Sequence, residues 1–63
     1  METIIANCTV TLENDNCYIE RNGFSASLAC LEDTGCLHNG DASVRLSRIT
    51  IRQIAAYAES HAT

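Results

Sequence analysis

The alternation of apolar and polar side chains from Thr3 to Glu13 constrains the fold of this chain more than any other feature. This period of two is that of a β-strand, whose side chains point alternately to opposite faces. β-branched residues are dense in the segment, and the turn-forming cluster Asn14-Asp15-Asn16 ends it. The pattern therefore predicts a first strand over Thr3–Glu13. Its core-facing residues are predicted to be Ile4, Ala6, Cys8, Val10 and Leu12.

A tight turn and further alternation predict three more strands. Asn22-Gly23 is the pair best suited to a type I′ hairpin turn, because both central residues of that turn need positive φ. Strands are therefore predicted on either side of it, over Cys17–Arg21 and Phe24–Glu32. The glycine-containing segment Asp33–Asp41 is predicted to be a loop, and Ala42–Ser47 a short fourth strand.

The C-terminal segment carries two signals for the start of a helix. Thr50 followed by Gln53 has the form of a capping box, and Ile49 is placed to pack on Ile54 as a hydrophobic staple. Apolar residues then recur at helical spacing, which predicts one buried stripe. That stripe consists of Ile51, Ile54, Ala55, Ala58 and Ala62.

These elements predict an α+β fold in a single domain over residues 1–63. The expected architecture has two layers, an antiparallel β-meander of three to four strands with one C-terminal helix packed on one face. A chain of 63 residues is close to the smallest that a core alone can stabilise. A metal, a disulfide or a second subunit is therefore expected to contribute, and the flat face opposite the helix makes a homodimer one alternative.

Charge and hydropathy exclude several classes of partner. The net charge is -4, from eight acidic and four basic residues, so direct nucleic-acid binding is not expected. No apolar run approaches the ~18 residues of a membrane span, so no membrane partner is expected. The N-terminus lacks the basic and apolar segments of a signal peptide. A cytoplasmic location is predicted, where thiols stay reduced.

The cysteines and histidines leave a metal site as the alternative interpretation. Structural zinc sites usually pair ligands two to four residues apart, and the four cysteines lack that spacing. A zinc site with an unusual ligand spacing would use Cys30, Cys36 and His38. The favoured interpretation makes Cys8 and Cys30 small apolar core residues, with no cofactor bound.

Catalysis is not expected. A cysteine nucleophile needs a base within reach, whereas His38 is near only Cys36 in sequence and His61 lies at the far end of the helix. A chain this short is also expected to be unable to form a pocket of several hundred Å³, the usual size of a small-molecule site.

A non-enzymatic, protein-binding module is therefore the leading hypothesis. It would be a small acidic inhibitor or regulator of a larger partner, of the anti-defence or anti-CRISPR kind that phages and mobile elements encode. Leu37 is expected either to anchor such a contact from its loop or to tuck over the end of the core. The predicted partner-binding residues are Tyr18, Glu20, Arg21, Leu37, Arg52 and Tyr57. The alternative is a structural domain stabilised by zinc through cysteine and histidine.

Overall fold

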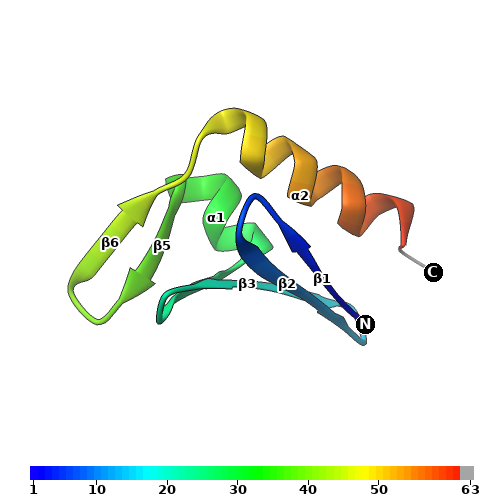
Figure 1. Cartoon of the computed structure of the whole chain (residues 1–63), viewed down its shortest axis with the longest axis horizontal. Coiled ribbons are helices and arrows are strands. Elements are labelled where there is room, and N and C mark those ends of the chain that lie inside the picture. Colours follow the sequence, from blue (N-terminus) through cyan, green and yellow to red (C-terminus); the bar gives the residue numbers. More distant parts are fainter. Residues whose placement is uncertain (62–63) are drawn as a thin grey trace.

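The protein, described over residues 1–61 by a computed structural model, forms a six-stranded antiparallel sheet with two helices (Figure 1). The strands are β1 Glu2–Ile5, β2 Cys8–Glu13, β3 Asn16–Arg21, β4 Phe24–Ser27, β5 Cys36–Asn39 and β6 Ala42–Arg45, and the helices are α1 Leu28–Thr34 and α2 Arg48–Ser60. The order of strands in the sheet follows the chain. The α+β class and the antiparallel meander are confirmed, while the predicted three to four strands and one helix are too few.

The predicted first strand is in fact a hairpin. Ala6 and Asn7 have φ of 50° and 66°, and Ile5 pairs with Cys8 across this two-residue turn. The Asn22-Gly23 turn, by contrast, carried the sequence signal of a type I′ turn, and it has the predicted positive φ at both residues. The first turn reverses which side chains face inward: Ile5 packs against the core, whereas Ile4, predicted to be buried, is 71% exposed.

The predicted strand Phe24–Glu32 ends at Ser27, where α1 begins. The Ser27 hydroxyl accepts a hydrogen bond from the Cys30 N–H at 3.2 Å, and this caps the first turn of the helix. Gly35, with φ of 76°, ends the helix and donates its N–H to the Leu31 carbonyl. Cys30 therefore lies in a helix, and the prediction that placed it in a strand is wrong.

The predicted loop Asp33–Asp41 is also wrong, because most of it forms a hairpin. β5 and β6 pair with Leu37 opposite Val44, and β5 continues the sheet beside β4 through the pair Ser25 and His38. Leu37 is fully buried. Leu37 therefore packs in the core and is not exposed as a contact anchor.

α2 starts earlier than predicted. Its N-cap is Ser47, whose hydroxyl accepts from the Thr50 N–H at 3.1 Å, so the capping box assigned to Thr50 and Gln53 is wrong. Ile49 lies inside the helix and is 71% exposed, so it is not a staple. The apolar stripe is confirmed in the described residues: Ile54 is buried, and Ile51, Ala55 and Ala58 are half-buried. Ala62 lies outside the described residues.

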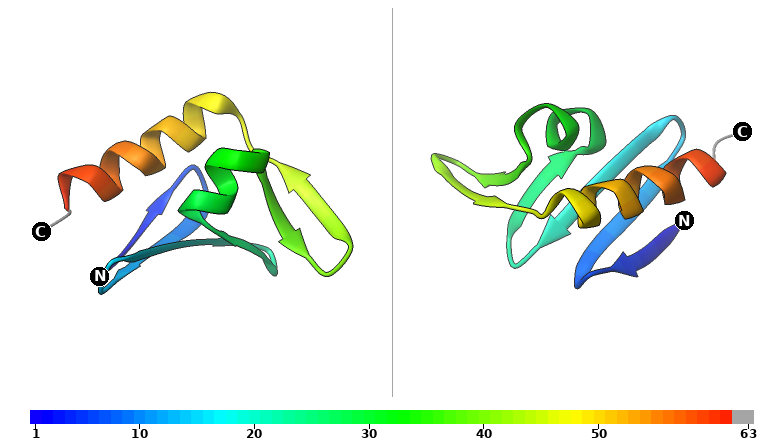
Figure 2. Two further views of the ribbon diagram at one scale, coloured as in Figure 1. Left: turned by 180° about the vertical axis from the view of Figure 1, so that it is seen from behind. Right: turned by 90° about the horizontal axis from the view of Figure 1, so that it is seen from above.

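Both helices lie on the same side of the sheet, so its two faces differ. In Figure 1 and in the view from above in Figure 2, α2 runs across the strands at the N-terminal end of the sheet, and α1 lies beside it. The buried core between the layers consists of Cys8, Val10, Ile19, Leu31, Leu37, Leu46 and Ile54. We call the side toward the helices the inner face and the opposite side the outer face. Within residues 1–61, no element covers the outer face.

Candidate functional site

The pairing of β1, β2 and β3 places one set of side chains together on the outer face. Ile4 is opposite Thr9, which is opposite Glu20, and in the neighbouring row Thr11 separates Glu2 from Tyr18. Residues directly opposite in antiparallel strands point to the same face. We define the outer patch as Glu2, Ile4, Thr9, Thr11, Tyr18 and Glu20.

The outer patch combines apolar anchors with an acidic border. Ile4 is 71% exposed and Tyr18 is 50% exposed, and the half-buried Thr9 and Thr11 lie on the strand between them. Exposed tyrosines are among the residues that contribute most to protein interfaces. Glu2 and Glu20 are exposed beside these anchors. The patch is therefore suited to a partner that offers an apolar pocket surrounded by basic groups.

The structure separates the predicted partner-binding residues. Tyr18 and Glu20 both lie in the outer patch. Arg21 is paired with Phe24, a residue packed against the core, and so is half-buried at the end of the inner face. Tyr57 is partly buried against the core and lies outside the outer patch. It also stacks on His61, with the ring centroids 4.3 Å apart.

Arg52 and Ile4 lie elsewhere than their sequence positions suggested. Arg52 is exposed, but it lies in a cleft away from the outer patch, beside the first turn of α2. Ile4 belongs to the patch, although the sequence pattern assigned it to the core. The turn that directs Ile4 outward was not predicted, because alanine at position 6 is not a typical turn residue. The useful signal was Asn7, since asparagine tolerates the positive φ of such turns.

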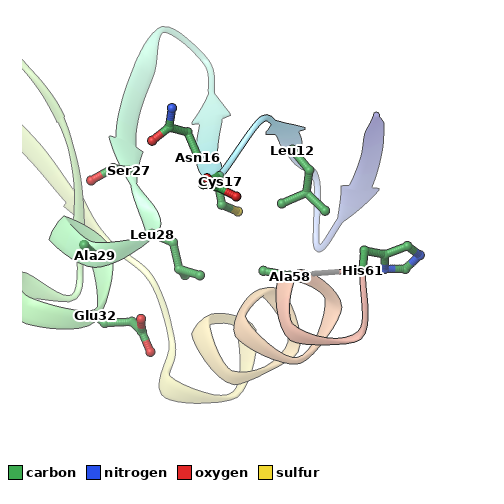
Figure 3. A pocket seen from close by; sticks show the side chains of 10 residues that line it. Leu12, Asn16, Cys17, Ser27, Leu28, Ala29, Glu32, Ala58 and His61 are labelled. Carbon is green, nitrogen blue, oxygen red and sulfur yellow. The ribbon is translucent and has the colours of Figure 1, made fainter. Parts of the chain in front are cut away.

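A second candidate is a hollow of about 490 Å³ on the inner face. It opens between the tip of the β2–β3 hairpin, the start of α1 and the end of α2 (Figure 3). The expectation that so short a chain could not form a pocket of this size is wrong. Its lining is largely apolar at Leu12, Leu28 and Ala58, with Cys17 and Glu32 adding polar atoms.

This hollow does not bring together a nucleophile and a base. Burial raises the pKa of the Cys17 thiol, which disfavours the thiolate that a nucleophile needs. The His61 ring points away from Cys17 (Figure 3), and its Nδ1 lies 2.9 Å from the Tyr57 carbonyl oxygen. The residues that line the hollow therefore show no catalytic pair.

The alternative zinc ligands are not gathered into a site. Cys30 lies in α1, whereas Cys36 and His38 lie in β5. His38 Nε2 is instead 3.4 Å from the Thr34 hydroxyl. Among residues 1–61, no group of three or more His, Cys, Asp or Glu side chains could hold a metal ion.

Within residues 1–61, neither helix has the length and apolar character needed to cross a bilayer. No family model, curated protein or solved structure matches the chain. The outer patch and the clefts of this fold are therefore the candidate sites.

Proposed function

We propose that this protein is a non-enzymatic binding module that inhibits or regulates a larger protein through the outer patch. The observation that carries the proposal is that Tyr18 and Ile4 are exposed on a sheet face that no other part of residues 1–61 covers. Isolated exposed apolar side chains are common on proteins, but two on one uncovered sheet face support its use as a contact surface.

The rigidity of the patch supports binding with little entropic cost. Two-residue turns join β1 to β2 and β2 to β3, and the inner sides of the same strands hold the buried residues Val10 and Ile19. Side chains held in place before binding lose less conformational freedom when a partner arrives. The patch therefore needs no rearrangement to present Tyr18.

Charge favours a basic partner over a second copy. Glu2 and Glu20 point to the outer face, because they pair with Thr11 and Thr9. Glu13 follows Thr11 by two residues on β2 and so points to the same face. Two copies meeting face to face would bring these carboxylates together, and like charges across an interface are unfavourable. The homodimer is therefore the weaker proposal, and the native mass in solution distinguishes the two.

The finer proposal concerns the kind of target. Complexes that hold nucleic acid in positively charged channels, as CRISPR effectors do, offer the basic surface that the outer patch complements. An anti-defence protein from a phage or mobile element is the proposed class. It would act in the cytoplasm, where the four cysteines, all unpaired, would stay reduced.

Site-specific photo-crosslinking tests the proposal. A photoreactive amino acid at position 18 is compared with the same group at position 53, because Gln53 is exposed on α2. We expect position 18 alone to crosslink to a protein with a basic surface in lysate of the source cells. Equal adducts at both positions, or adducts at position 18 with a second copy only, would contradict the proposal.

A further inference from the structure

Three of the four basic residues of the chain line one cleft, separate from the outer patch. The cleft has a volume of about 330 Å³, and Arg45, Arg48 and Arg52 form one part of its lining. Its lining residues come from the end of α1, from β6 and from the start of α2. A 2.9 Å hydrogen bond from the Leu46 N–H to the Gly35 carbonyl joins the segments after β6 and α1. The three arginines lie within eight consecutive residues, and the fold brings the end of α1 beside them.

The stability of α2 does not explain this arrangement. Arg48 is the first residue of α2, whose first turn contains no acidic residue. A positive side chain there is unfavourable, because the N-terminal end of a helix is itself positive. Arg48 and Arg52 are also four residues apart, the spacing at which like charges on a helix repel. Charges that oppose local stability point to a role in binding.

The three guanidinium groups belong to exposed residues, and one of them lies close to the backbone of Gly35. All three arginine side chains are exposed. Arg45 Nη1 lies only 3.1 Å from the position that a Cβ on Gly35 would occupy, so glycine leaves the space that this guanidinium group uses. Glu32 and Asp33 also line the cleft. The lining therefore carries three positive and two negative side chains.

We propose that this cleft binds a phosphate dianion, either free or as the phosphate group of a small monoester. The planar guanidinium fork matches the oxygen geometry of phosphate and of carboxylate. The charge selects between them, because a phosphate group carries about -1.5 to -2 at neutral pH and a carboxylate only one negative charge. The volume of the cleft leaves room for the organic part of a monoester.

The test is an NMR titration of the whole protein with inorganic phosphate and, separately, with phosphoserine. Sodium chloride and acetate of equal ionic strength are the controls for screening and for carboxylate binding. We expect saturable shifts of the Gly35, Arg48 and Arg52 amide signals with at least one phosphate compound. Shifts no larger than those with chloride, or equal binding of acetate, would overturn the proposal.

Matched variants separate the cleft from the net charge. Arg48→Gln and Arg52→Gln should each weaken phosphate binding about tenfold, as expected for the loss of a charge-assisted hydrogen bond. Arg21→Gln removes the same charge outside the cleft and should change binding less than about twofold. Glu32→Gln should strengthen binding. Far-UV circular dichroism confirms that each variant is folded, and equal weakening by Arg21→Gln would overturn the proposal.

Discussion

The two faces of β2 and β3 carry very different side chains on the same strands. On the inner face Val10 and Ile19 pair and are fully buried, whereas on the outer face Thr11 and Tyr18 pair and Tyr18 is half exposed. α1 and α2 lie on the inner side only (Figure 1). The comparison separates two roles, because the inner face stabilises the fold and the outer face is available to a partner.

The largest effect should come from the inner face. Ile54→Ala removes a fully buried side chain from α2 and should lower the free energy of unfolding by about 2–5 kcal/mol. Ile4→Ala on the outer face should change it by less than about 0.5 kcal/mol. Urea denaturation followed by circular dichroism measures both. Similar losses from the two variants would remove the distinction between the faces.

The cap of α2 should come next, because this helix covers the inner face. Ser47→Ala removes the hydroxyl that accepts from the Thr50 N–H and should lower the free energy of unfolding by about 1 kcal/mol. Gln53→Ala is the matched control, since Gln53 is exposed within the helix and is not part of a cap. Thermal unfolding measures both variants. A larger loss of stability for Gln53→Ala would instead place the N-cap at Thr50, as the sequence predicted.

A smaller effect of opposite sign is expected at the turn that sends Ile4 outward and Ile5 inward. Ala6 has φ of 50°, a conformation that costs about 1 kcal/mol for a residue with a Cβ. Ala6→Gly relieves that cost, although glycine also gains entropy in the unfolded chain. We expect a net stabilisation of up to about 0.5 kcal/mol in urea denaturation. Destabilisation would argue against this turn.

The smallest effect is the pH dependence at Cys17, on the inner face of β3. Burial favours the neutral thiol and raises its pKa, so its contribution to stability is complete below the ordinary thiol pKa. The contribution is lost as the pH rises through the raised pKa. At a mildly alkaline pH, iodoacetamide should modify Cys17 more slowly in the folded protein than in urea, as measured by peptide mass spectrometry. Equal rates would show that Cys17 is not shielded.

The sequence was sufficient where local chemistry decides the structure. Asn22-Gly23 adopts the positive φ values that its turn needs, and the apolar stripe of α2 faces the core around Ile54. It failed where two patterns compete. Leu28 and Leu31 fit a helix, but Phe24, Ala26 and Leu28 also fit a strand. The choice was decided by Ser27 and Gly35, which cap the two ends of α1.

The candidate site was only partly predictable, for a related reason. Tyr18 and Glu20 were predicted to be partner-binding residues, and both lie in the outer patch. Ile4 was not, because its direction depends on a turn that begins with alanine. The arginine cleft could be predicted only by knowing where α1 ends, and that segment was predicted to be a strand. Contacts between distant segments were beyond local reasoning.

Binding of a protein partner by the outer patch can be tested by one measurement of affinity. Ile4 and Ile49 are the same residue type with the same 71% exposure, one in the outer patch and one on α2. The partner identified by crosslinking is titrated against Ile4→Ala, Tyr18→Ala and Ile49→Ala by calorimetry. We predict a loss of about 30-fold for Tyr18→Ala, a smaller loss for Ile4→Ala and no change for Ile49→Ala, with thermal stability preserved. Unchanged affinity for both outer-patch variants would contradict the claim.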